Sequence, residues 1–268
     1  MSIRVEYIPS ATADLDGADL ELIIGRPDSG GEEVGLLFVH GLGHGAWCWQ
    51  RWQAMAADLG VDSWAMSLRG HGNSGGSVRG ATLSTYVRDV LRAVEHLATR
   101  PVVLVGHSVG GLVVQRLIAE GVSEAVRGAV LLSSIPSGPA ISTVLAVATR
   151  HPVQALRFLA GLPMRLPNRL LFSDAGEHES EMKCMQADSP RVQYQLLFHR
   201  PTAVTDKPVL VVGGADDRLV PLATQLRTAR RYEAETQVIG DAGHDLMLEP
   251  TGDGGLDAIV RWSNRLVT

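Results

Sequence analysis

The sequence predicts an α/β protein in which a mostly parallel, doubly wound β-sheet carries a helical insertion. Short apolar runs recur along the chain, and amphipathic stretches with helical spacing separate most of them. Residues 136–207 break this alternation, because they contain no convincing strand. A chain of 268 residues with 45% apolar and 20% charged residues suits one large domain. We therefore expect a core domain of residues 1–135 and 208–268, interrupted by residues 136–207.

The elements of the core follow from the positions of the apolar residues. Strands are expected at residues 20–24, 35–39, 62–66, 102–105, 129–132, 209–212 and 236–239. Helices are expected at residues 50–59, 83–98, 108–120, 222–231 and 256–266. Strands that alternate with helices form a parallel sheet. The two earliest strands are joined without a helix and fit an antiparallel edge.

Helical patterns fill much of the insert, which we define as residues 136–207. Helices are expected at residues 141–149, 152–160 and 177–187, and at a fourth segment that ends at Phe198. Pro152 suits the first turn of the second helix, and Ser189 followed by Pro190 suits the start of the fourth. The insert is expected to be a lid over a site. The alternative is a structural excursion packed on the side of the domain.

Composition and charge argue against several classes of partner. The net charge of −5 is mild, and no basic tract suggests nucleic acid. No run approaches the roughly 18 apolar residues of a membrane span. Residues 1–10 carry two charges and lack the apolar core of a signal peptide. Cys48 and Cys184 are expected to be free, buried thiols. These features favour a cytoplasmic protein that acts on a small molecule.

Two short patterns suggest a cofactor or a metal but lack the context that either needs. Residues 70–75 match a dinucleotide fingerprint, yet they lead into more glycine and not into a helix. His40 and His44 are spaced like metal ligands but flank glycines, without a third ligand nearby. We therefore expect neither a cofactor nor a metal.

The most informative motif is G-H-S-V-G at residues 106–110. It lies between an apolar strand and an amphipathic helix, which is the setting of the nucleophile elbow of a hydrolase. The same pattern recurs as G-N-S-G-G at residues 72–76, but in a glycine-rich stretch with no strand before it and no helix after it. Ser108 is therefore the candidate nucleophile, and Ser74 is a loop serine.

A serine nucleophile needs a base, and the base needs an acid to orient it. His244 follows the last predicted strand and precedes the last predicted helix, so it should reach the same sheet edge as Ser108. Asp217 follows the strand at residues 209–212 and is the candidate acid, with Asp216 as the fallback. The loop after residues 129–132 offers serines but no carboxylate.

The oxyanion that forms during acyl transfer needs backbone N–H donors. One is expected from Val109, the residue after the nucleophile. The second is expected from Leu42, in the glycine-rich loop that follows the strand at residues 35–39. In this loop His40 should act as a brace through its own hydrogen bonds. Candidate substrate-binding residues are Gly41, His44, Leu145 and Phe158.

The chain order Ser108, Asp217, His244 resembles that of the α/β-hydrolase superfamily, and the resemblance covers nearly the whole chain. It implies the α/β-hydrolase fold. Residues 40–49 are similar to the oxyanion loop of the plant methylesterase and hydroxynitrile lyase group. In the lyases a Lys follows the catalytic His, where this chain has Asp245, and a hydroxyl residue stands where this chain has Leu42. Both departures argue against cyanohydrin lysis.

A second motif is similar to another branch of the superfamily. Residues 68–74 resemble the corresponding segment of bacterial esterases and monoacylglycerol lipases, in which an Asp usually opens the motif. This chain has Ser67 at that position.

We therefore expect a serine hydrolase that cleaves a carboxylic ester of a small to medium, apolar substrate through an acyl-enzyme on Ser108. One alternative is another reaction of the same triad, on a lactone, a thioester or a carbon–carbon bond, or an elimination. A slow-turnover ligand receptor and a non-catalytic scaffold are the others. The fold hosts many chemistries, so the substrate does not follow from it.

Overall fold

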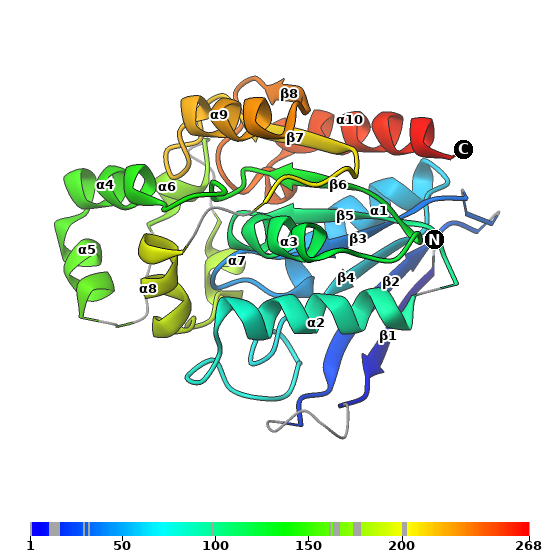
Figure 1. Cartoon of the computed structure of the whole chain (residues 1–268), viewed down its shortest axis with the longest axis horizontal. Helices are drawn as coiled ribbons and strands as arrows, with labels where there is room; N and C mark the ends of the chain where they lie inside the picture. The colour runs from blue at the N-terminus through cyan, green and yellow to red at the C-terminus, as the bar shows by residue number, and fades with distance from the viewer. Residues whose placement is uncertain are drawn as a thin grey trace.

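A computed structural model describes residues 2–10, 17–28, 30–31, 33–97, 99–160, 162, 167–173, 178–199 and 203–267, without the side chains of residues 142, 146, 158 and 159. Within these ranges the strands form one eight-stranded sheet in the order β1-β2-β4-β3-β5-β6-β7-β8 (Figure 1). The strands are β1 Ser2–Ile8, β2 Leu20–Arg26, β3 Gly35–Val39, β4 Ser63–Met66, β5 Val102–His107, β6 Val126–Leu132, β7 Val209–Gly214 and β8 Glu235–Ile239. The predicted α/β fold with a mostly parallel sheet is confirmed.

The antiparallel edge differs in detail from the prediction. Strands β3 to β8 pair in parallel, and β2 pairs antiparallel with both β1 and β4. The edge is thus the β1–β2 pair and not the pair of strands predicted first. Strand β1 was not predicted, because its apolar side chains Ile3, Val5 and Tyr7 are about half exposed and form no buried run.

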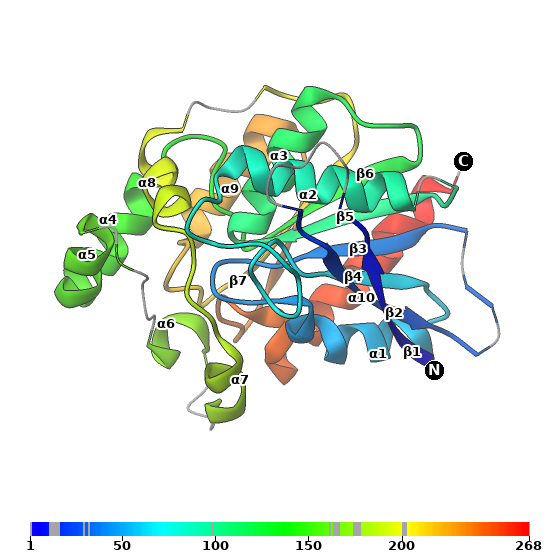
Figure 2. The ribbon, with the colours of Figure 1, turned by 90° about the horizontal axis from the view of Figure 1, so that it is seen from below.

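Helices cover both faces of the sheet (Figure 2). One face carries α2 Leu83–His96, α3 Val109–Glu120 and α9 Leu222–Tyr232, and the other carries α1 Gln50–Asp58 and α10 Asp253–Ser263. Short 3-10 helices are η1 Ala46–Trp49, η2 Leu246–Leu248, η3 Pro250–Gly252 and η4 Asn264–Leu266. Helix α2 begins at a capping box between Thr82 and Thr85, which satisfies the backbone groups of its first turn.

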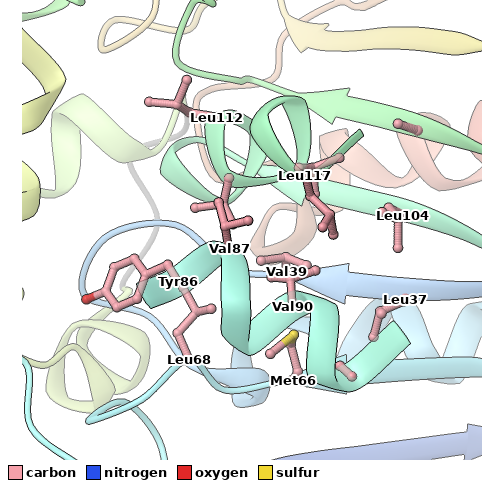
Figure 3. Packing of buried hydrophobic residues seen from close by; sticks show 14 of the residues in the cluster. Leu37, Val39, Met66, Leu68, Tyr86, Val87, Val90, Leu104, Leu112 and Leu117 are labelled. Atoms are coloured by element: carbon pink, nitrogen blue, oxygen red, sulfur yellow. The ribbon is translucent and has the colours of Figure 1, made fainter. Parts of the chain in front are cut away.

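Alternation along β3 divides the core into two layers. Leu37 and Val39 point into the cluster that includes α2 and α3, where Figure 3 shows Val39 beside Val90. Leu36 and Phe38 point to the opposite face, among buried residues of α1 and α10. Successive side chains of a strand alternate between faces, so a strand buried on both faces is apolar throughout. This explains the continuous apolar runs in the sequence.

The insert forms the helices α4 Ile141–Arg150, α5 Pro152–Leu159, α6 Asn168–Leu171, α7 Glu179–Cys184 and α8 Pro190–Phe198. They gather beyond one end of the sheet (Figure 1). The predicted start of α8 is confirmed, since the Ser189 side chain accepts a hydrogen bond from the Val192 amide at 3.3 Å and Pro190 occupies the first turn. Helix α6 was not predicted.

Two further expectations from the sequence concern the cysteines and membrane-spanning helices. Both cysteines are free, but only Cys48 is buried. The expectation that Cys184 is buried is wrong, because it ends the polar helix α7, which buries none of its residues. Among the helices that the structure describes, none is both long and apolar enough to cross a bilayer.

Candidate active site

The turn from β5 into α3 holds Ser108 in an unusual backbone conformation. Its φ is 53° and its ψ is −116°, in a region that residues other than glycine rarely adopt. Such a conformation costs about 1–3 kcal/mol and persists only where the surroundings enforce it. Here the Ser108 amide donates to the Leu132 carbonyl at 3.0 Å, and the Ser108 carbonyl accepts from Gly111 and Ile135, each at 3.1 Å. The turn places Ser108 at the carboxyl edge of the parallel strands.

His244 and Asp217 come together at the same edge, although 27 residues separate them. His244 Nδ1 and Asp217 Oδ2 lie 2.9 Å apart, and both side chains are almost fully buried. The carboxylate is fixed further by N–H donors: Leu219 and Val220 reach Oδ1 at 2.9 and 2.8 Å, and Gln225 reaches Oδ2 at 3.1 Å. The neighbour Asp216 is exposed, so the structure brings Asp217 and not the fallback residue to His244.

The environment of His244 favours its charged form. Burial lowers the pKa of His244, but the charge of Asp217 and its hydrogen bond outweigh burial and raise the pKa above its ordinary value. The other ring nitrogen, Nε2, is buried and has no hydrogen-bond partner among the described residues. His244 lines the same pocket as Ser108. Its ring is thus fixed through Nδ1, while Nε2 is left without a partner in the part of the chain that the structure describes.

The loop after β3 passes directly behind Ser108. A Cβ added at Gly41 would lie 2.9 Å from the Cβ of Ser108, closer than real Cβ contacts allow, so only glycine fits. As expected, His40 acts as a brace: its Nδ1 donates to the Gly41 carbonyl at 2.8 Å, and its Nε2 accepts from Leu68 at 3.0 Å. The backbone N–H groups of Leu42 and Val109 donate to no acceptor among the described residues, and both residues line the pocket.

The pocket is apolar and narrow. It encloses about 40 Å³, enough for a few water molecules. Apart from the histidines, Ser108 and Thr143, its lining is aliphatic: Leu42, Val109, Ile135, Ala140, Val144, Val147, Ala155, Leu171, Leu196 and Leu219. Much of this lining belongs to the insert, on α4, α5, α6 and α8. Space of this shape suits a hydrocarbon chain and offers few partners to a polar one.

The four predicted substrate-binding residues do not all line the pocket in the structure. Gly41 lies behind Ser108, and His44 lines the pocket. Leu145 is 57% exposed and is not among the lining residues, while Val144 and Val147 of the same helix are. The side chain of Phe158 lies outside the described residues.

Sequence reasoning missed a group of buried polar residues beside His244. Asp245 Oδ2 lies 3.2 Å from His44 Nε2, and Asp245 Oδ1 lies 3.4 Å from His107 Nε2. Burial would raise the pKa of Asp245, but the histidines around it, His44 first, lower it to about 2. Burial and the nearby His244 lower the pKa of His107 to about 3, so its ring is neutral at pH 7. The only sequence signal was the position of Asp245 directly after His244.

Within the described residues, one group of side chains offers a set of donor atoms for a metal ion. The donor atoms of His107, His244 and Asp245 lie within 4.8 Å of one another. His107 Nε2 already donates to the His244 carbonyl at 3.0 Å, and His244 Nδ1 is paired with Asp217. Two of these three residues therefore already use a ring nitrogen in other contacts.

The structure also explains Ser67, which stands where the resembling esterases have Asp. Its hydroxyl donates to Glu21 Oε2 at 2.6 Å and accepts from the Ala46 amide at 2.8 Å. Glu21 also accepts from the backbone and side chain of Asn73. The carboxylate at this position is thus supplied by β2. Ser74 donates to the Ser67 carbonyl at 2.6 Å, as a bonded loop serine.

The comparison with known proteins agrees with this geometry. Residues 36–253 match the alpha/beta hydrolase family, and the chain belongs to this family. A monoacylglycerol lipase of Mycolicibacterium smegmatis is 28% identical over 93% of this chain and 94% of its own length. A probable esterase of Oryza sativa is 39% identical over 101 residues, 37% of this chain and 38% of that protein. The match therefore spans well under half of that rice protein.

A solved structure extends the likeness over the complete chain. A soluble variant of monoglyceride lipase from Saccharomyces cerevisiae, in complex with a substrate analog, has a TM-score of 0.79 and 16% identity, and the match covers 100% of this chain and 96% of that one. At this identity the likeness shows the fold alone. The family match and the esterase and lipase relatives identify the chain as a hydrolytic enzyme, as the sequence predicted.

Proposed function

We propose that this enzyme hydrolyses a carboxylic ester with an apolar acyl or alkyl group, through an acyl-enzyme on Ser108. One observation carries the proposal: His244 and Ser108 line one pocket, and Asp217 fixes Nδ1 of His244 while Nε2 has no partner among the described residues. The arrangement fits a general base waiting for the proton of a nucleophile. The names of the two relatives, a lipase and a probable esterase, support an ester as the substrate.

The proposed mechanism uses each group in turn. Ser108 Oγ attacks the ester carbonyl while its proton passes to His244 Nε2, and Asp217 stabilises the imidazolium that forms. The N–H groups of Leu42 and Val109 bind the oxyanion of the tetrahedral intermediate. His244 then protonates the leaving alkoxide, which departs as the alcohol. Water, deprotonated by His244, attacks the acyl-enzyme and releases the carboxylic acid and Ser108.

The insert acts in this proposal as a lid. A small-molecule site usually measures about 300–1,000 Å³. The pocket that Ser108 lines encloses about 40 Å³, which is too small for such a substrate in this structure. Insert helices α4, α5 and α8 supply Val144, Val147, Ala155 and Leu196 to its lining. We infer that these helices move apart to admit substrate and that their apolar side chains then contact its hydrocarbon part.

The test combines active-site labelling with turnover. A fluorophosphonate probe should form a stoichiometric adduct that peptide mapping places on Ser108, and Ser108→Ala should abolish both the adduct and turnover of p-nitrophenyl esters. Esters of medium acyl length should be better substrates than acetate, because the pocket is apolar. Unchanged turnover by Ser108→Ala would reject the proposal. Labelling of Ser108 without cleavage of any ester would instead direct the search to lactones, thioesters or carbon–carbon bonds.

A further inference from the structure

We propose that two buried histidine–carboxylate pairs, one from the core and one reaching in from the insert, position the oxyanion loop. They hold the peptide group between Leu42 and Gly43 by its carbonyl and by its N–H. Asp245 and Asp188 are the carboxylates of these pairs and act as positioning residues. The inference rests on the proposed function, because it assigns these residues to the loop that would bind the oxyanion.

The core side holds the carbonyl of this peptide group. His44 Nδ1 donates to the Leu42 carbonyl at 2.9 Å, and His44 Nε2 lies 3.2 Å from Asp245 Oδ2. Both ring nitrogens thus face acceptors, and Asp245 is completely buried. Asp245 follows His244 directly, so the position of the oxyanion loop is tied to the loop that carries the proposed base.

The insert side holds the N–H of the same peptide group. The Gly43 amide donates to Asp188 Oδ2 at 2.9 Å, and the Gly43 carbonyl accepts from the Gln186 amide at 2.8 Å. Asp188 is itself fixed by His71 Nε2 and by the Tyr86 hydroxyl, each at 3.2 Å. Although burial would raise the pKa of Asp188, the charge of His71 and the hydrogen bonds from His71, Gly43 and Ser189 lower it, so the carboxylate stays ionised.

These contacts fix the peptide groups on either side of the Leu42 N–H. The Gly41 carbonyl is held by His40, and both polar groups of the next peptide unit are held by His44 and Asp188. The Leu42 N–H between them has no acceptor among the described residues, and Leu42 lines the pocket. A pre-positioned donor is worth about 10²–10³ in rate, and displacement of a reacting group by about 1 Å costs about 10². Loss of either pair should therefore affect the transition state more than the bound substrate.

The experiment compares Asp188→Ala, Asp188→Asn and Asp245→Asn in the full chain. We measure kcat and KM for a p-nitrophenyl ester, and the inhibition constant of an alkyl trifluoromethyl ketone, which forms a tetrahedral oxyanion adduct with a serine. Asp188→Ala should lower kcat about 10- to 100-fold with little change in KM, and should weaken the ketone by a similar factor. Asp188→Asn keeps an oxygen acceptor for the Gly43 amide and should retain more activity than Asp188→Ala.

The control is Asp62→Asn, which removes a mostly buried carboxylate that pairs with Arg100 at 2.9 Å. Asp62 directly precedes β4, at the end of the parallel strands opposite to the site, so kcat and ketone affinity should be unchanged. Should Asp188→Ala not fold, the two Asn variants carry the test. Because both side chains hold one peptide group, the effects of Asp188→Asn and Asp245→Asn should not be independent in the double variant.

Three results separate failure of this inference from failure of the proposed function. Turnover that depends on Ser108 but is unchanged in the folded Asp188 and Asp245 variants would overturn the positioning role alone. An effect on KM alone, with kcat and the inhibition constant of the ketone unchanged, would also overturn the positioning role. Turnover that survives Ser108→Ala would overturn the proposed function itself, whatever the Asp variants do.

Discussion

Replacing Gly41 by Ala tests how tightly the oxyanion loop is fitted behind Ser108. The added Cβ would lie 2.9 Å from the Cβ of Ser108 and 2.9 Å from His107 Nδ1. Non-bonded carbon atoms settle at about 3.5–4.0 Å, so the loop or the elbow must shift by roughly 0.6–1 Å. A misplacement of about 1 Å costs about 10²-fold in rate. We therefore expect Gly41→Ala to lower kcat about 100-fold with a smaller change in KM.

The assay is steady-state hydrolysis of a p-nitrophenyl ester, with thermal unfolding measured in parallel. Gly80→Ala is the matched control, because a Cβ at Gly80 meets no atom within 4 Å, and its activity should equal that of the wild type. A folded Gly41→Ala enzyme with the kcat of the wild type would refute the reasoning, since it would show that the loop can retreat without cost to the proposed oxyanion site.

Three further predictions follow from the geometry and charges of the site. Asp217→Asn should lower kcat by about 10⁴-fold, because the amide favours the wrong tautomer of His244. Asp216→Asn should leave kcat unchanged, so steady-state kinetics of the two variants decide which aspartate is the acid. Because His244 must be neutral to act as a base and its pKa is raised above 6.5, kcat/KM should rise with pH through a midpoint above 6.5, and a midpoint below that value would contradict the pairing with Asp217. The pKa of Asp245 is lowered from 3.8 to about 2, so its contribution to stability is complete above pH 3.8 and is lost as the pH falls toward 2. The advantage of the wild type over Asp245→Asn in urea unfolding should therefore shrink by about 2 kcal/mol over this range, and a constant difference would count against an ionised Asp245.

The central part of the site could be predicted from the sequence because its residues follow local rules. A serine between an apolar strand and a helix, an aspartate after a later strand and a histidine after the last strand each occupy the carboxyl end of a parallel strand, and such ends share one edge of the sheet. Topology thus brings Ser108, Asp217 and His244 together without knowledge of any side-chain contact.

The supporting residues could not be predicted in this way. Asp188 reaches Gly43 across 145 positions, Asp245 reaches His44 across 201, and Ser67 reaches Glu21 across 46. Hydrophobic periodicity does not predict such a pair, because the two partners are far apart in the sequence and neither forms a local pattern with the other. The residues of α4 that line the pocket could not be predicted either, because Val144 and Leu145 both belong to its broad apolar side and only tertiary packing distinguishes them.

The loop that carries His244 and Asp245, here called the histidine loop, limits how such an enzyme can be re-engineered. The amides of His244 and Asp245 both donate to the carbonyl of Leu171 in α6, at 2.8 and 2.9 Å. The insert therefore supports the histidine loop through Leu171 and the oxyanion loop through Gln186 and Asp188. A specificity graft that exchanges only α4, α5 and α8, and leaves α6 in place, keeps these three anchors. A chimera that replaces the insert from end to end discards them, and strips two loops of the core of their backbone partners along with the old specificity.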